Sequence, residues 1–370
     1  MVKIGSVELR QLEMPLVSAF ETSGWREDEK TCIIVRLNDD SFSGFGECAV
    51  STGPWYGSET LASAWFVLEE YLVPLLLGRE FENAGQVLSA MDSVRGNNMA
   101  KASAEMAFWD LLGKSSGKSL SKLLGGTQGS VPSGVSVGLQ KTREKLVDVV
   151  GGYVEEGYRR IKIKIKPGRD VELVEAVREE FPDMPLMVDA NGAYDPRESA
   201  ALRKLDAFEL LMIEQPFAWN DLVEHARLKK LIRTPVCLDE SVASLDDLES
   251  ALALDSFGVL NIKPARLGGL SISRMVHDVC KGRGLPVWCG GLLETGVGRA
   301  ANVALASLPG FVMPGDISAS NRYFKEDIVK PDFRLDEDGT IRVQSGPGIG
   351  VEVVEDRLEK FTVKRKEFKP

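Results

Sequence analysis

Five charged residues recur along this chain at nearly one fixed step, and each lies at the end of a short apolar run. They are Lys164, Asp189, Glu214, Asp239 and Lys263, separated by 25, 25, 25 and 24 residues. A β-strand and its returning helix occupy roughly this many residues, so the step predicts consecutive βα units. Because each charge ends its strand, we expect the five side chains to converge on one rim of a parallel barrel.

Apolar runs on both sides of this series extend the same organisation. Eight such runs, with helical patterns between them, predict the strands of a (β/α)8 barrel, whose carboxyl-terminal strand ends carry the chemistry. The predicted strands span residues 133–139, 160–166, 186–191, 210–216, 236–241, 258–264, 287–293 and 313–318.

The first 125 residues follow a different pattern. Strand patterns at 2–14, 31–39 and 42–50 precede helical patterns at 58–77, 83–94 and 99–114. Strands followed by helices are typical of a compact α+β domain. About 50 residues follow the last predicted strand, and we expect them to return to this domain. The predicted division is therefore 1–125, 126–320 for the barrel, and 321–370 for the return.

Bulk properties exclude several classes of protein. The chain has 370 residues, is 44% hydrophobic and carries a net charge of −10, which is ordinary for a globular protein and argues against a broad nucleic-acid surface. No apolar run is long enough to span a membrane, and no apolar leader opens the chain, so we expect a cytoplasmic protein. Five scattered cysteines without a CxxC pair predict buried, reduced thiols. We also expect a homo-oligomer.

The second predicted barrel strand carries alternating lysines. In the run from Ile161 to Lys166, side chains alternate between the two faces, so isoleucines face the helices and lysines face the barrel axis. A solvated edge strand would show the same alternation, but a mid-barrel strand has no free edge. Neighbouring ammonium groups, such as those of Lys162 and Lys164, are expected to lower each other's proton affinity, which favours a neutral amine able to act as a base.

The three carboxylates of the series predict a metal site. Asp189, Glu214 and Asp239 would lie on three adjacent strands, and oxygen ligands of this kind suit Mg²⁺, with Mn²⁺ or another divalent ion as a substitute. Any one of them alone could cap a helix instead. Only two histidines are present, which argues against a histidine-type zinc site.

Lys263 would face Lys164 across the barrel, since strands two and six of eight are opposed. Two lysines on opposite faces of a metal-bound carboxylate substrate can remove the proton α to the carboxylate and return it from either side. Enolase-superfamily sites, with a lysine or histidine base and Mg²⁺, use this chemistry.

Several motifs carry a family resemblance that covers nearly the whole chain. Lys162-Ile163-Lys164 on strand two and Lys263 on strand six resemble the muconate-lactonizing subgroup of the enolase superfamily. VDANGAY, IEQPF, CLDES, NIKPARLGG, GGLLETGVGRAAN and GDISASNRYF resemble the o-succinylbenzoate synthase and N-succinylamino acid racemase family. The resemblance implies a modified, (β/α)7β barrel and an α+β capping domain formed by both ends of the chain.

The resemblance also implies roles for individual residues. Lys164 and Lys263 would be the acid–base pair with Lys162 as electrostatic partner of Lys164, and Asp189, Glu214 and Asp239 would bind Mg²⁺. The substrate pocket would include Ser136, Arg266, Gly291, Leu293, Phe20 and Tyr56, supported by Asn191 and Glu240. Lys166 stands where relatives often carry glutamate, but the following Pro167-Gly168 selects Lys164 as the base. Ordinary surface or packing roles are the alternatives for Arg266 and for the two aromatic residues.

The resemblance implies activity on a small-molecule carboxylate. The leading expectation is o-succinylbenzoate synthase, which dehydrates 2-succinyl-6-hydroxy-2,4-cyclohexadiene-1-carboxylate in menaquinone biosynthesis. N-succinylamino acid racemisation with the same two lysines is the alternative, and one protein can have both activities. A dipeptide epimerase is less favoured, because those enzymes share Asp-x-Asp where this chain has Asp316-Ile317-Ser318. A metal-binding scaffold without activity is least favoured, because both lysines are present.

Overall fold

A curled parallel sheet forms the centre of the protein in the computed structural model, which describes residues 1–370. Its seven strands follow each other in chain order from β7 to β13, each parallel to the next. They are β7 (Gly134–Val137), β8 (Arg160–Lys164), β9 (Leu186–Asp189), β10 (Ile213–Glu214), β11 (Val236–Leu238), β12 (Val259–Ile262) and β13 (Val287–Cys289). The predicted modified barrel fold is confirmed.

The prediction of a regular eighth strand at 313–318 is wrong. One isolated bridge remains there, joining Gly315 to Ser133, and a second joins Phe311, just before the segment, to Val287. Pro314 has no N–H to donate, which disfavours a continuous ladder. The segment still bonds to both ends of the sheet: the amide of Gly134 donates to Gly315 O at 2.7 Å, and the amide of Asp316 donates to Cys289 O at 2.9 Å. The barrel is thus closed by a bridge rather than by a strand.

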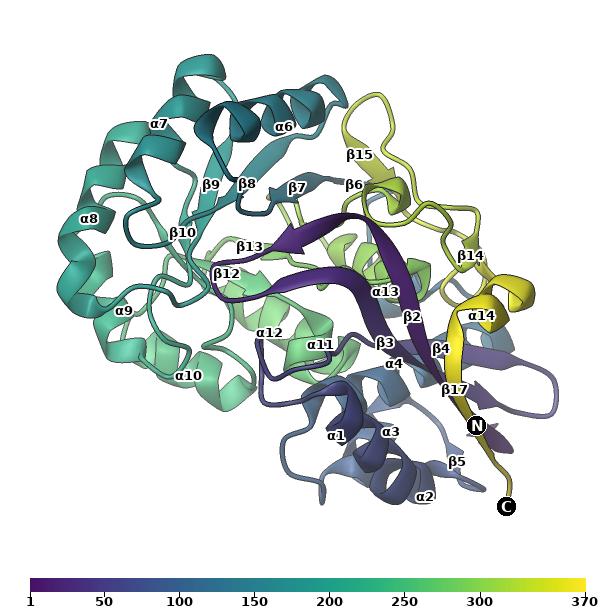
Figure 1. Ribbon diagram of the computed structural model, residues 1–370. Helices are drawn as coiled ribbons and strands as arrows, with labels where there is room; N and C mark the ends of the chain where they lie inside the picture. Colours follow the sequence, from purple (N-terminus) through teal and green to yellow (C-terminus); the bar gives the residue numbers. More distant parts are fainter.

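Helices cover the outside of the sheet (Figure 1). Each apolar helix face packs on the strands; in α12, for example, Leu270, Val276 and Cys280 are buried at helical spacing. Side chains of Thr142, Ser244 and Thr295 cap the first turns of α6, α10 and α13. The helices are α6 (Arg143–Glu155), α7 (Val171–Glu180), α8 (Ser199–Lys204), α9 (Leu222–Lys229), α10 (Leu245–Ala253), α11 (Pro264–Leu267), α12 (Leu270–Gly282) and α13 (Gly296–Ala306), with single turns η2 (Pro196–Glu198), η3 (Leu205–Phe208) and η4 (Ser320–Arg322).

A second sheet, antiparallel and of order β17-β2-β3-β4, lies beside the barrel. It joins the two ends of the chain, because β17 (Thr362–Phe368) pairs with β2 (Ser6–Glu21), which pairs with β3 (Arg26–Asn38) and then β4 (Ser43–Cys48). Its helical partners are α1 (Leu61–Val67), η1 (Leu68–Leu72), α2 (Val73–Leu76), α3 (Ala84–Met91), α4 (Asn98–Ser116) and α5 (Leu120–Leu124). The capping architecture is as predicted, while the domain limits at 125 and 320 stay predictions.

Glycines allow α4 to lie directly on β4. A Cβ at Gly44 would lie 2.2 Å from Ala107 O, and one at Gly46 would lie 2.0 Å from Ser103 O. Short elements complete the chain: β1 (Val2–Lys3), β5 (Glu80–Phe81), β6 (Ser130–Pro132), β14 (Val329–Lys330), β15 (Thr340–Arg342), β16 (Glu352–Val353) and α14 (Glu355–Phe361).

The long β2–β3 hairpin reaches from this second sheet over the end of the barrel (Figure 1). The amide of Leu139 donates to Glu21 O at 2.8 Å, and the amide of Val17 donates to Tyr323 O at 2.9 Å. The hairpin tip therefore covers the carboxyl-terminal rim on which the charged series converges. All five cysteines are buried and free, as predicted. No helix is both long and apolar enough to cross a membrane.

Candidate active site

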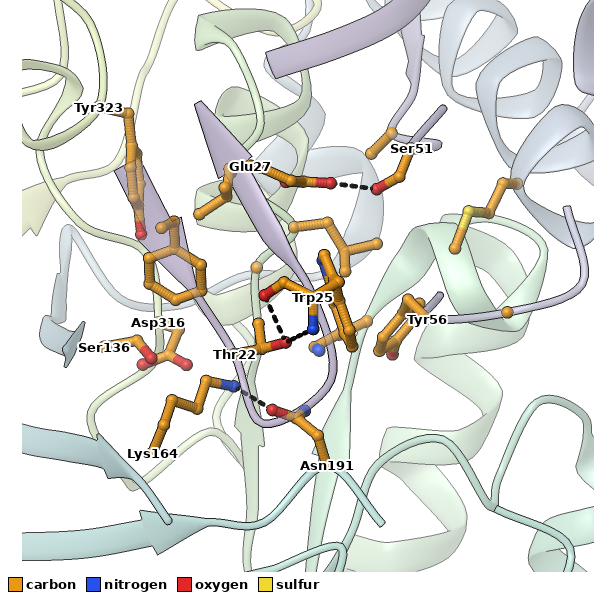
Figure 2. A pocket seen from close by; sticks show the side chains of 18 of the residues that line it. Thr22, Trp25, Glu27, Ser51, Tyr56, Ser136, Lys164, Asn191, Asp316 and Tyr323 are labelled. Carbon is orange, nitrogen blue, oxygen red and sulfur yellow. Dashed lines mark hydrogen bonds between the residues drawn. The ribbon is translucent and has the colours of Figure 1, made fainter. Parts of the chain in front are cut away.

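A pocket lies between the hairpin tip and the barrel rim (Figure 2). Lys164 and Asn191 project into it from the barrel, while Trp25 and Tyr56 come from the capping side. Lys162 and Lys263 line it as well. Both sides of the molecule therefore contribute to the pocket wall.

The pocket contains most of the predicted substrate residues. Ser136, Gly291, Leu293, Phe20 and Tyr56 all line it. Arg266 and Glu240 do not; they line a neighbouring cavity on the other side of Tyr56. Lys166 lies outside the pocket, half-buried in a bridge with Arg169.

The lysine strand β8 has the predicted alternation, with every residue buried. Lys164 Nζ donates to Asp189 Oδ2 at 2.7 Å and to Asn191 Oδ1 at 2.8 Å. Lys162 lies one layer deeper, and its Nζ is 2.9 Å from Glu214 Oε2 and 2.5 Å from Asp316 Oδ2. Both lysines thus contact buried carboxylates beneath the pocket, and we call these the carboxylate layer.

One prediction about these lysines is wrong for Lys162. Burial alone would lower its pKa, but the neighbouring charges of Asp316, Glu214 and Asp189 raise the pKa well above the ordinary lysine value. Lys162 is therefore a fixed cation, because three carboxylates surround it.

Lys263, directly after the end of β12, lies opposite Lys164 in the pocket wall. Its Nζ donates to Asp239 Oδ2 at 2.7 Å, and its pKa is raised by the charge of Asp239 against the opposing effect of burial. A ring from the capping side lies over each lysine of the pocket: Phe20 is 5.8 Å from Lys164 Nζ and Tyr56 is 4.4 Å from Lys263 Nζ, measured to the ring centroids. At each of two places in the pocket, an aromatic ring therefore covers a lysine ammonium group.

The three predicted metal ligands come from three neighbouring strands, and Asp239 lies two residues beyond Cys237, the register partner of Glu214. Asp189 and Glu214 are direct partners in the β9–β10 register, and Asp239 follows β11. Despite burial, Lys164 and Lys162 lower the pKa of Asp189 to about 2, and Lys263 and Arg266 lower that of Asp239 further. Burial and then the charge of Asp189 raise the pKa of Glu214 to about 7.

This donor set fits a divalent cation. All its atoms are oxygens, and Oε2 of Glu240 and Oδ1 of Asn261 are two further buried oxygens without a hydrogen-bond partner. Burial and then the charge of Asp239 raise the pKa of Glu240 to about 8. No three histidine, cysteine, aspartate or glutamate side chains form a metal-holding group as they stand; instead, Lys162 bridges Asp189 and Glu214 at 3.3 and 2.9 Å.

Backbone strain marks the strand ends around this layer. Asn191, Gln215 and Leu293 have φ angles of 44°, 40° and 57°, in the left-handed region that costs energy for residues other than glycine. Gln215 also fixes the next strand end, since its Oε1 accepts the amide of Asp239 at 2.9 Å. Asn191 and Leu293 line the pocket, so two of these strained positions lie in its wall.

Asp316 and Tyr323 are pocket residues that sequence reasoning missed. Both line the cavity, on the same side as Ser136 (Figure 2). Asp316 ends the segment that replaces the eighth strand and pairs with Arg160 at 2.7 Å. The five charged residues were selected because each lies near the end of a predicted strand, and the same criterion would have selected Asp316. No comparable sequence pattern points to Tyr323.

Both parts of the chain match the sequence models of known protein families. Residues 145–357 match the family model "Enolase C-terminal domain-like", and residues 2–125 match "Mandelate racemase / muconate lactonizing enzyme, N-terminal domain". Enzymes of the enolase superfamily generally use a divalent metal ion.

Individual relatives cover almost the full length. An o-succinylbenzoate synthase of Geobacillus kaustophilus is 47% identical over 98% of this chain and 96% of its own length. An N-succinylamino acid racemase of Amycolatopsis sp. is also 47% identical, over 98% of each chain. A crystal structure of an enolase-superfamily member from Listeria innocua covers 100% of both chains at 42% identity, with a TM-score of 0.96. The chain belongs to the enolase superfamily and, within it, to the family of the o-succinylbenzoate synthases and N-succinylamino acid racemases.

Proposed function

We propose that this protein is a Mg²⁺-dependent o-succinylbenzoate synthase that dehydrates 2-succinyl-6-hydroxy-2,4-cyclohexadiene-1-carboxylate. The observation that carries the proposal is the pair Lys164 and Lys263, which line one pocket from opposed strands, each against a carboxylate. Full-length relatives at 46–47% identity that bear this name support the substrate.

Asp189, Glu214 and Asp239 would hold the Mg²⁺ ion. When bound, this ion neutralises charge on the substrate carboxylate and so makes the adjacent C–H bond more acidic. Lys164 Nζ removes the α-proton from one face. For dehydration, the same ammonium group then protonates the leaving hydroxyl, while Lys263 stays a cation on the other face. Asn191 orients Lys164 through their 2.8 Å hydrogen bond.

The aromatic rings on the capping side contribute in a different way. Phe20 and Tyr56 cover the two lysines and exclude water from the reacting carbon. Lys162, a fixed cation below Lys164, offsets the negative charge of the carboxylate layer.

We also propose N-succinylamino acid racemisation as a second activity of the same site. It requires proton exchange on both faces of the α-carbon, and the presence of a lysine at each position favours it. The Amycolatopsis relative bears this activity in its name at the same identity.

A paired assay on one Mg²⁺-loaded preparation tests both proposals. Dehydration is followed by absorbance as the aromatic product forms, and racemisation by the optical rotation of an N-succinylamino acid. We expect both activities, and dehydration without racemisation would overturn the second proposal. Absence of both would overturn the substrate assignment, and racemisation alone would make the second proposal the main activity.

A further inference from the structure

A buried carboxylate of the capping domain holds the start of a barrel helix. Glu105, two turns into α4, is fully buried. Its Oε2 accepts the amide of Leu270 at 2.8 Å, and its Oε1 accepts the amide of Ser271 at 2.9 Å. These are the first two amides of α12, a helix that has no capping side chain at its own N-cap residue. The capping domain therefore supplies the cap of α12.

Every partner of Glu105 is a hydrogen-bond donor. Its Oε1 also accepts the hydroxyl of Ser271 at 2.5 Å and the indole N–H of Trp109 at 2.7 Å. Burial raises the pKa of Glu105 while these donors lower it, and no lysine or arginine is among its partners. The donors and the positive end of α12 thus stabilise the buried charge.

The backbone before α12 is shaped for this contact. Gly269 has a φ angle of 131°, in a region that only glycine adopts readily. A Cβ at Gly269 would also lie 2.6 Å from Oε2 of Glu105. Any larger residue at this position would displace the carboxylate, so the glycine and the cap belong to one arrangement.

The capped turn is joined to Lys263 by a short hydrogen-bonded segment. Lys263 directly precedes α11, and its carbonyl oxygen accepts the amide of Leu267 at 3.1 Å. The amide of Gly269 donates to the carbonyl oxygen of Pro264 at 2.9 Å. The single turn of α11 is therefore closed at both ends, and a shift of α12 would be transmitted to Lys263.

A second residue of α4 holds the same segment. Asn98 Nδ2 donates to the carbonyl oxygens of Arg266 and Ala243, both at 2.8 Å. Asn98 and Glu105 are seven residues apart, so they lie on one face of the helix, about 10 Å from each other along its axis. Helix α4 therefore contacts α11 and the start of α12 at two points (Figure 1).

Lys164 is held by a different part of the molecule. It ends strand β8, and its Nζ donates to Asp189 and Asn191. No hydrogen bond joins α4 to β8 or to either of these partners. A change at Glu105 should therefore reach one lysine of the pair and not the other.

We infer that Glu105 is a positioning residue for Lys263: by fixing the start of α12 it holds, through the turn of α11, the Lys263 ammonium group at one face of the substrate's α-carbon. Glu105 does not line the pocket, so it acts only through this segment. The inference rests on the proposed function, because it needs the two lysines to act on opposite faces.

Replacing Glu105 by glutamine tests this role with little change of shape. Glu105→Gln removes the charge, and its NH₂ group would face a donor, since all the partners are donors. The measurement is the exchange of the α-proton with D₂O for each enantiomer of an N-succinylamino acid, by NMR with Mg²⁺. Lys164→Ala and Lys263→Ala identify which lysine serves which enantiomer. We expect the rate through Lys263 to fall about tenfold or more and the rate through Lys164 to change less than about twofold.

Glu47→Gln is the matched control. It makes the same change at another buried carboxylate of the capping domain, one that accepts amides of α13 rather than of α12. We expect the ratio of the two rates to stay within about twofold of wild type. A general loosening of the two domains would affect both variants alike.

Amide hydrogen exchange, followed by mass spectrometry, tests the same role without turnover. In Glu105→Gln, residues 259–273, from β12 to the first turn of α12, are expected to exchange faster than in wild type. Residues 160–164 of β8 serve as the internal reference and are expected to be unchanged.

The outcomes separate this inference from the proposed reaction. An equal loss of both rates, or unchanged amide exchange in 259–273, would overturn the inference. Should Glu105→Gln fold poorly, Asn98→Ala is expected to shift the ratio of rates in the same direction, and an unchanged ratio there would count against it. If wild type exchanged neither enantiomer, the proposed reaction would be contradicted. Amide exchange would then decide whether Glu105 holds the Lys263 segment.

Discussion

Lys162 Nζ lies 2.5 Å from Oδ2 of Asp316, so strand β8 is tied by charge to the segment that closes the barrel in place of an eighth strand. Asp316 is also 2.7 Å from Arg160, and all three side chains are buried. These charges lower the pKa of Asp316 despite its burial. The carboxylate thus links the closure of the barrel to the lysine strand of the site.

Replacing this carboxylate by an amide should therefore lower the stability of the fold. Asp316→Asn keeps the shape but leaves the buried Arg160 without its carboxylate partner and removes one of the three carboxylates around Lys162. Breaking a buried ion pair in this way typically costs about 3–5 kcal/mol. Urea unfolding monitored by circular dichroism measures the loss. A variant as stable as wild type would show that the two cations are compensated by other groups.

The buried carboxylate of Glu47, which lies apart from the lysines of the pocket, should make the stability of the fold depend on pH. It is buried, and its carboxylate accepts the amides of Thr295 and Gly298 at the start of α13. Burial, with the charge of Glu294 as a smaller cause, raises its pKa from 4.5 to about 7, against the opposing charge of Lys30. The folded state therefore binds a proton more tightly than the unfolded state, and the free energy of unfolding falls as pH rises from about 4.5 to 7.

Glu47→Gln should remove this contribution. Its size is at most about 1.4 kcal/mol per pH unit. Unfolding free energies of both proteins at pH 5, 6 and 7 give the slopes, and we expect a flatter profile for the variant. Parallel profiles would assign the pH dependence to other groups.

Metal binding should be visible in stability as well as in activity. Dialysis against EDTA is expected to abolish α-proton exchange, and added Mg²⁺ to restore it. A ligand that binds only the folded state at 100 times its dissociation constant stabilises it by about 2.7 kcal/mol, so Mg²⁺ should raise the melting temperature. Glu214→Gln should lose most of this increase. An equal increase in the variant would place the metal elsewhere.

The two lysines should have separable roles. With Lys263→Ala, racemisation is expected to stop, because one face of the α-carbon has no acid or base. Exchange of the α-proton of one enantiomer with D₂O should persist through Lys164, and NMR of each enantiomer measures it. Loss of exchange for both enantiomers in a folded variant would show that Lys263 acts chiefly as a cation.

Most of the barrel and of its charged rim could be predicted because each strand leaves a local signal. Apolar runs located seven strands correctly, from β7 to β13, and five of these strands, β8 to β12, have a charge at or directly after their end. The segment 313–318 has the same apolar character, but its pairing depends on contacts of Pro314 and Gly315 with strands far away in the sequence. No local pattern distinguishes a bridge from a strand there.

The charge state of Lys162 and the place of Tyr323 in the pocket wall were harder to predict, because both depend on residues far away in the sequence. The expectation that Lys162 loses proton affinity considered only the neighbouring lysine, whereas three carboxylates from three other segments decide its pKa. Tyr323 enters the pocket because the β2–β3 hairpin binds its carbonyl through Val17, a contact across more than 300 residues. Both outcomes depend on the assembled fold.

The central claim is that Lys164 removes the α-proton, and the register of the lysine strand tests it most directly. Lys164 lines the pocket, whereas Lys166, two residues further along, lies outside it. The measurement is the rate at which the α-proton of an N-succinylamino acid exchanges with D₂O in the presence of Mg²⁺, followed by NMR for Lys164→Ala and Lys166→Ala. We predict loss of exchange for one enantiomer by at least about a hundredfold in Lys164→Ala and a nearly unchanged rate in Lys166→Ala. A rapid rate in Lys164→Ala together with a lost one in Lys166→Ala would contradict the account.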